Sequence, residues 1–196
     1  MASLSDFGVG FLVAGYLVII TFFVIQRFLR KTEGAKSFHG GAYDRGNMVL
    51  IGSATALGLW LPIIAAVLGF TMFEFHLALA VAALAFMLLG VALRIWAAVT
   101  LGAFYTTTLM IADGQKVITS GPYAWVRNPG YLGEILLWSA FGVLSDSLIV
   151  AILLPVMFVT VYLYRISAEE AMLAKELGDD YLHYQKRTRK LVPFVY

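Results

Sequence analysis

Long apolar runs alternate with short polar segments along most of the chain. Three early runs, at about 8–27, 48–70 and 75–99, reach the length of about 20 predominantly apolar residues that a membrane-spanning helix needs. Two further runs, 131–144 and 147–164, are joined by the turn-like sequence SDS. We therefore predict an all-α integral membrane protein with five transmembrane helices, the last two paired as a helical hairpin.

The fourth apolar run is short for a membrane span. Its 14 residues would form a helix of about 21 Å, less than a hydrocarbon core about 30 Å thick. Asn is a favoured residue for capping a helix N-terminus and Pro is favoured at the first helical position, so Asn128 and Pro129 are predicted to begin this helix. We expect the segment VRNPGY to be held at or below the membrane surface.

Composition supports the membrane assignment, because 61% of the residues are hydrophobic and 13% are charged. Soluble domains average about 45–50% apolar and about 25% charged residues. The chain has no cysteine, which excludes disulfides, thiolate metal sites and cysteine nucleophiles. Its three histidines are scattered singly, so we expect no metal site, and we expect no nucleic-acid partner.

The basic residues predict an orientation. With the N-terminus outside and five passes, the inner segments are about 27–46, 100–130 and 165–196, and they hold 13 of the 14 Lys and Arg residues. This positive-inside bias predicts a cytoplasmic C-terminus. The short loops and the lack of a targeting extension indicate a prokaryotic plasma membrane.

The segment after the fifth run carries charged candidates. RISAEEAMLAKELG (165–178) is predicted to form a cytoplasmic helix that leaves the membrane and stops at Gly178, with a second short helix after it. Arg165 and Glu169 are four residues apart and share a helical face. Arg165 is suited to hold an anionic group. Glu169 is favoured as a ligand contact, and Glu170 as a solvent-facing or loop contact.

Two charged residues lie inside the third and fourth apolar runs. Glu134 is one turn into the short fourth helix, where an acid at membrane depth is a functional candidate, although the helix dipole also favours it there. Arg94 is expected to snorkel or to pair with an acid. The chain has no P-loop, Gly-x-Gly-x-x-Gly, Gly-x-Ser-x-Gly or HExxH motif, so a nucleotide-like cofactor would bind through membrane helices. These patterns place a candidate site in 115–134 and 165–170.

Four motifs lie between residues 93 and 193: LRIWAAVTLG (93–102), GQKVITSGPYAWVRNPGY (114–131), RISAEEAMLAKELGDDYLHY (165–184) and RTRKLVP (187–193). Together they resemble the isoprenylcysteine carboxyl methyltransferase family and the related phospholipid methyltransferases. The resemblance implies a membrane enzyme that binds S-adenosylmethionine in a cytoplasmic-side pocket and releases S-adenosylhomocysteine. It also implies a lipophilic substrate that enters from the bilayer.

The resemblance also implies site residues. Arg165 would meet the substrate end, and Thr108 matches a cofactor position only loosely. The family usually has His where this chain has Asn128, and Asn cannot titrate near neutral pH. Methyl transfer to a carboxylate requires no general base, so a carboxyl acceptor such as an isoprenylcysteine-like group is favoured, with Arg165 and Asn128 as the catalytic candidates. The predicted cofactor contacts are Gln115, Lys116, Val117, Ile118, Tyr123, Asn128, Pro129, Gly130, Tyr131 and Glu169.

We predict one polytopic membrane domain, 1–196, in which 1–99 forms three spans and 100–196 forms a cofactor-binding methyltransferase core. Two alternatives stay open at this point. One is a membrane NADPH-dependent reductase of the steroid 5α-reductase-like type, and the other is a non-catalytic lipid-binding membrane protein. Monomer and dimer are both compatible with the sequence, since a small-residue pattern such as Ala54-x-x-x-Gly58 is weak by itself.

Overall fold

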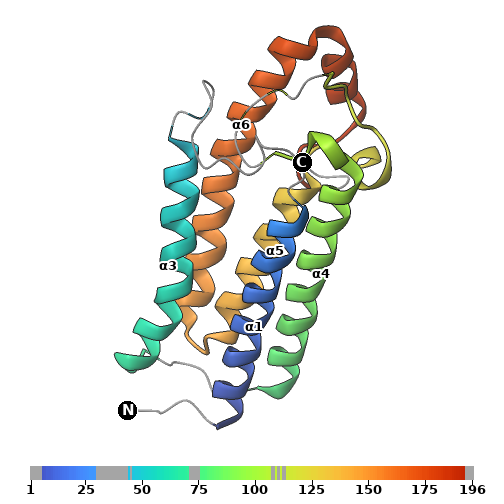
Figure 1. The fold of residues 1–196 in the computed structure, drawn as a ribbon. Coiled ribbons are helices and arrows are strands. Elements are labelled where there is room, and N and C mark those ends of the chain that lie inside the picture. Colours follow the sequence, from blue (N-terminus) through green and yellow to red (C-terminus); the bar gives the residue numbers. More distant parts are fainter. Residues whose placement is uncertain are drawn as a thin grey trace.

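The computed structural model describes residues 6–29, 44, 46–70, 76–106, 109, 111 and 114–192. Within these ranges the α-helices are α1 (Asp6–Leu29), α3 (Asn47–Val67), α4 (Leu77–Leu101), α5 (Pro129–Leu144) and α6 (Leu148–Arg187), and the 3-10 helices are η1 (Gly102–Phe104) and η2 (Gly121–Ala124). α1, α3, α4 and α6 are long and apolar enough to cross a membrane, and α5 is a shorter apolar helix. The predicted all-α membrane fold is confirmed, with the five helices side by side (Figure 1).

The short helix α5 lies among the other helices. It packs against α4, α6 and α1, while α3 packs on α6. Ten of its 16 residues are buried, so its sides face protein more than lipid. A helix surrounded in this way need not match the thickness of the bilayer, because its neighbours span it instead.

Paired glycines set the distance between α4 and α5. A Cβ added to Gly90 would lie 2.5 Å from the carbonyl oxygen of Gly133, and a Cβ added to Gly133 would lie 2.5 Å from the carbonyl oxygen of Gly90. Small residues at such a crossing let two backbones approach closely. The crossing brings Arg94 on α4 next to Glu134 on α5.

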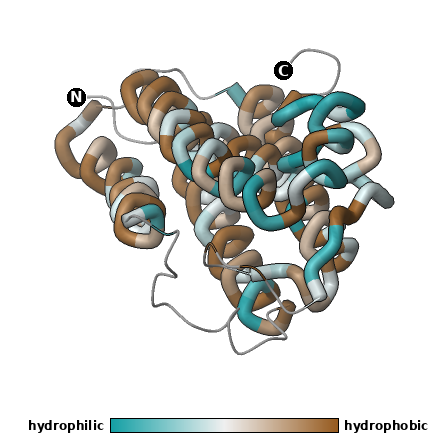
Figure 2. The backbone as a smooth tube through the Cα atoms, turned by 90° about the horizontal axis from the view of Figure 1, so that it is seen from above, coloured by the Kyte–Doolittle hydropathy of each residue, from teal (hydrophilic) through white to brown (hydrophobic). Residues whose placement is uncertain are grey.

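The long helix α6 continues past the bundle and then changes direction. At Gly178 the backbone is non-helical, with φ 56° and ψ −133°, a conformation that glycine adopts without a Cβ clash. This break confirms the predicted stop at Gly178. The turns that follow fold back toward the loop before α5 (Figure 1). Seen from this end of the bundle, hydrophilic residues gather in these turns and loops, and the helices below are mostly hydrophobic (Figure 2).

The chain after α6 returns to the protein. The carbonyl oxygen of Arg189 accepts a hydrogen bond from the backbone N–H of Arg127 at 2.8 Å, and the N–H of Arg189 donates to the carbonyl of Trp125 at 3.3 Å. Leu191 is buried in the hydrophobic core. The tail therefore lies against the protein through Leu191, whereas Pro193 and beyond lie outside the described residues.

Candidate functional site

A cavity of about 350 Å³ lies where the helices meet the loop before α5, within the range of about 300–1,000 Å³ typical of ligand pockets. Every predicted cofactor residue except Pro129 lines it, and so does Arg165. Pro129 is buried at the first position of α5, and Thr108 lies outside the described residues. The predicted residues at this cavity are Gln115, Lys116, Val117, Ile118, Tyr123, Asn128, Gly130, Tyr131, Arg165 and Glu169.

Tyr131 joins the two residues predicted to share a face of the last helix. Its hydroxyl accepts a hydrogen bond from Nε of Arg165 at 2.9 Å and donates to Oε2 of Glu169 at 2.5 Å. Arg165 is only 3% exposed, so its charge lies in a low-dielectric environment where interactions with anions are strong. The arrangement fixes a guanidinium group at the cavity wall.

A second acid reaches the same guanidinium from the chain before α3. Oδ1 of Asp44 lies 3.6 Å from Nη1 of Arg165, and both side chains are buried. Oδ2 of Asp44 accepts a hydrogen bond from the backbone N–H of Met48 at 3.2 Å. The sequence reading missed this residue, because 121 positions separate it from Arg165 and no local pattern marks it.

Arg94 and Glu134 form a second ion pair at the cavity. Nε of Arg94 lies 2.9 Å from Oε1 of Glu134, and the hydroxyl of Tyr162 donates to the other oxygen of that carboxylate. Arg94 also donates to the hydroxyl of Tyr105 at 3.1 Å, and Tyr105 donates to Gln26. The expectation that Arg94 pairs with an acid is confirmed, and all five side chains line the cavity.

Asn128 precedes α5 as predicted, but its side chain makes no capping hydrogen bond within the described structure. Its amide nitrogen donates instead to Oε1 of Glu170 at 3.0 Å and to the carbonyl oxygen of Lys190 at 2.9 Å. Both N–H bonds of the amide are therefore directed to the protein. Only the side-chain carbonyl oxygen remains for a further contact.

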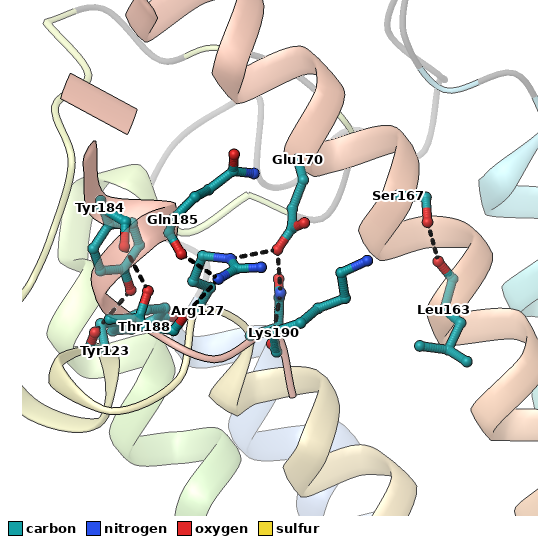
Figure 3. Close-up of polar contacts among 10 residues, drawn as sticks. Tyr123, Arg127, Leu163, Ser167, Glu170, Tyr184, Gln185, Thr188 and Lys190 are labelled. Carbon is teal, nitrogen blue, oxygen red and sulfur yellow. Dashed lines mark hydrogen bonds and ion pairs between the residues drawn. The ribbon is translucent and has the colours of Figure 1, made fainter. Parts of the chain in front are cut away.

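Arg127 ties the same corner to the C-terminal turns. Its Nε donates to Oε1 of Glu170 at 2.8 Å, and its Nη1 donates to the carbonyl oxygens of Gln185 at 3.0 Å and Thr188 at 2.5 Å (Figure 3). Glu170 is 8% exposed. The loop contact expected of Glu170 is therefore present, whereas the solvent-facing alternative is wrong, because two donors draw this carboxylate into the protein.

Aromatic rings form much of the cavity wall. Tyr123, Tyr131, Tyr181 and Tyr184 all line it, and the hydroxyl of Tyr184 donates to the carbonyl oxygen of Tyr123 at 2.8 Å (Figure 3). Burial raises the pKa of the Tyr123 phenol, while the charge of Arg94 opposes that rise. Tyr123 therefore stays neutral and keeps its hydroxyl proton at physiological pH.

The sequence reading also missed the wall contributed by the first two helices. Phe22, Phe23 and Gln26 of α1 and Ile51 of α3 line the cavity. The one local signal is Gln26, a polar residue within an apolar run, and it is 3% exposed. Within the described ranges, no group of three His, Asp or Glu side chains is arranged to hold a metal ion.

Comparison with known proteins gives the family. The isoprenylcysteine carboxyl methyltransferase (ICMT) family model matches residues 83–175. The chain is 30% identical to protein-S-isoprenylcysteine O-methyltransferase B of Arabidopsis thaliana, with 97% of each chain covered. It is 29% identical to protein-S-isoprenylcysteine O-methyltransferase of Schizosaccharomyces pombe, over 58% of this chain and 49% of that protein.

A solved structure gives the fold independently. The structure of the eukaryotic intramembrane Ras methyltransferase ICMT matches with a TM-score of 0.57 and 22% sequence identity, over 74% of this chain and 52% of the other. At this identity the likeness concerns the fold, and it agrees with the helical arrangement described above. Taken with the nearly full-length match to the Arabidopsis protein, the chain belongs to the ICMT family and is a membrane methyltransferase.

Proposed function

We propose that the protein transfers a methyl group from S-adenosylmethionine to the carboxylate of a lipophilic substrate, such as an isoprenylcysteine-like group. One observation carries the proposal. Gln115–Ile118, Tyr131 and the Arg165/Glu169 pair are distant in sequence, yet they line one cavity that also has apolar walls from α1 and α3. Polar groups for a cofactor and an apolar surface for a lipid are thus in one place.

The residues at the cavity fit the chemistry of S-adenosylmethionine. Its cationic groups suit the carboxylate of Glu169 and the faces of the tyrosine rings. Its carboxylate and hydroxyl groups suit Lys116 and Gln115, which offer an ammonium group and an amide. When bound, this cofactor supplies a methyl group on a positively charged sulfur, which a carboxylate accepts without help from a base.

Arg165 holds the substrate carboxylate in this proposal. Its guanidinium group is planar and always charged, so it offers two parallel N–H donors to a carboxylate. Tyr131 fixes its orientation through the 2.9 Å bond to Nε. A carboxylate is ionised at neutral pH, so no proton has to be removed from it. The reaction therefore does not need the general base that a His in place of Asn128 could supply. Asn128 acts as a positioning residue, because its bond to Glu170 holds the start of α5 against α6.

The lipid part of the substrate lies against the apolar wall in this proposal. Phe22, Phe23, Met48 and Ile51 line the cavity from α1 and α3, and both helices expose large apolar residues that suit contact with lipid. The half 1–99 then supplies the lipid-facing wall, and 100–196 supplies the cofactor contacts.

The cavity end of the bundle faces the cytoplasm in this proposal, in a prokaryotic plasma membrane. The support is the charge of that end, where Arg27 lies in the last turn of α1 and Lys186 and Arg187 lie in the last turn of α6. Basic residues are enriched on the cytoplasmic side of membrane proteins.

Ligand-dependent thermal stability of the detergent-purified protein tests the cofactor. S-adenosylhomocysteine at 100 times its dissociation constant should stabilise the native state by about 2.7 kcal/mol, and NADPH should not stabilise it. Stabilisation by NADPH alone would support the reductase instead. Stabilisation by neither would support the non-catalytic lipid-binding protein.

The Arg165→Ala variant tests the acceptor site. We expect methyl-ester formation on a prenylcysteine carboxylate to fall by at least about 30-fold, because a buried hydrogen-bonded charge pair is worth roughly 2–5 kcal/mol. Stabilisation by S-adenosylhomocysteine should persist, which also shows that the variant is folded. The exposed Arg187→Ala is the matched control. A normal rate in Arg165→Ala would refute the assignment of Arg165.

A further inference from the structure

We propose that Asp44 is an internal counter-ion of Arg165 that a substrate carboxylate displaces, so that Asp44 sets the affinity for carboxylate substrates. The inference rests on the proposed function, in which Arg165 holds the acceptor carboxylate. It adds a specificity-determining residue from the chain before α3, outside the segments that supply the other polar groups.

The ion pair between Asp44 and Arg165 is buried, but its two charged groups lie too far apart to form a hydrogen bond. The exposed fractions are 5% for Asp44 and 3% for Arg165, yet the Oδ1–Nη1 distance is 3.6 Å. Hydrogen bonds from nitrogen to oxygen span about 2.7–3.2 Å, and in the described part of the chain Oδ1 of Asp44 has no hydrogen-bond partner. Attraction between the charges therefore holds this oxygen near Arg165, and a carboxylate able to hydrogen-bond would bind the guanidinium more strongly.

Asp44 accepts three hydrogen bonds at the start of α3. Oδ2 accepts from the backbone N–H of Met48 at 3.2 Å. The backbone carbonyl of Asp44 accepts from the N–H of Asn47 at 2.7 Å and from its side-chain amide at 2.5 Å. These three bonds hold the first turn of α3, and none involves Oδ1. Separation of Oδ1 from Arg165 would therefore leave the start of α3 intact.

When a substrate carboxylate binds Arg165, one of the carboxylates already near this guanidinium has to move away. The guanidinium already faces Asp44 directly and Glu169 through Tyr131. A third carboxylate at the same site adds a repulsive charge in a low-dielectric environment. Glu169 lines the cavity and suits the cationic cofactor, whereas Asp44 does not line the cavity. Asp44 is therefore the carboxylate that substrate displaces.

The Asp44→Asn variant tests this exchange. Asn keeps an oxygen for the N–H of Met48 and removes the charge. With S-adenosylhomocysteine bound, the affinity for an N-acetyl-S-prenylcysteine carboxylate should rise about tenfold, because removal of a close competing charge typically changes binding by this order. The affinity for its uncharged methyl ester should stay the same. With S-adenosylmethionine, KM for the carboxylate should fall in proportion while kcat changes less than about twofold.

The control is Asp180→Asn, an exposed acid beyond the break at Gly178, which should change neither affinity. An unchanged or weaker carboxylate affinity in Asp44→Asn would overturn the inference, as would equal changes for carboxylate and ester. Tighter S-adenosylhomocysteine binding alone would overturn it by assigning Arg165 to the cofactor. If Asp44→Asn does not fold, Asp44→Ser is measured instead, because serine also keeps a capping oxygen. Its ratio of carboxylate affinity to ester affinity is judged in the same way.

Stabilisation of the wild-type protein by S-adenosylhomocysteine distinguishes a failure of the proposed function from a failure of the role of Asp44. Its absence would refute the proposed function, and the inference with it. Its presence, together with an unchanged ratio of carboxylate to ester affinity in Asp44→Asn, would leave the proposed function standing and refute the role of Asp44 alone.

Discussion

A methyl group added at Gly133 should weaken the fold, although alanine is normally better than glycine in a helix. The new Cβ would lie 2.5 Å from the carbonyl oxygen of Gly90 and 2.9 Å from the backbone nitrogen of Arg94. Ordinary contact begins at 3.4 Å, so α4 and α5 would have to separate by roughly 0.9 Å, and atoms packed around the crossing would lose dispersion contacts. Overpacking costs about 1–3 kcal/mol, and the higher helix propensity of alanine returns about 1 kcal/mol. We expect a net loss of up to about 2 kcal/mol.

Thermal unfolding in detergent, followed by tryptophan fluorescence, measures this effect. A loss of up to about 2 kcal/mol should lower the melting temperature by up to about 8 °C for a chain of this length. The control is Gly10→Ala in α1, where no described atom lies within 4 Å of the added Cβ, so its melting temperature should hold or rise. A Gly133→Ala protein that melts at or above the temperature of Gly10→Ala would refute the close-crossing argument.

Two further substitutions test the hydrogen bonds that join Arg127 and Asn128 to Glu170. Glu170→Gln should destabilise the fold by about 1–3 kcal/mol and weaken S-adenosylhomocysteine binding, because Arg127 loses its buried counter-ion; calorimetry measures both, and wild-type behaviour would refute the coupling. Asn128→His should still bind S-adenosylhomocysteine but lose about 1 kcal/mol of stability, because one ring nitrogen cannot donate both bonds that the amide makes to Glu170 and Lys190. An Asn128→His protein without cofactor affinity would show that the two residues are not equivalent here.

The membrane helices were predictable from the sequence because the length of an apolar run directly determines whether it can cross a bilayer. The break at Gly178 was predictable because glycine tolerates the positive φ found there. Both signals are local. The Gly90–Gly133 crossing and the Asp44–Arg165 pair were not predictable, because each depends on two residues whose distance is set by packing of the whole bundle.

The side chain of Asn128 shows why a local preference is an incomplete guide. An N-cap Asn accepts a backbone hydrogen bond through its side-chain oxygen. Here the C-terminal turns bring the carboxylate of Glu170 and the carbonyl of Lys190 within hydrogen-bond distance of the amide nitrogen. A hydrogen bond to a charged group is roughly twice as strong as a neutral one, so these two donated bonds set the orientation of the side chain, and α5 begins without a side-chain cap.

These contacts join the C-terminal turns to the loop of Arg127 and Asn128, which is proposed to hold the cofactor. Residues 185–190 receive three hydrogen bonds from the side chains of Arg127 and Asn128, and backbone bonds of Arg189 pair the tail with the same loop. The loop reaches the cavity through Tyr123 and Asn128, so its geometry depends on a tail that has already folded back. Because Gly178 allows that reversal, a residue that lies outside the cavity wall decides whether the wall is complete. A cofactor that binds only the completed wall would therefore stabilise the C-terminal turns, by a free energy that rises with its concentration relative to its dissociation constant.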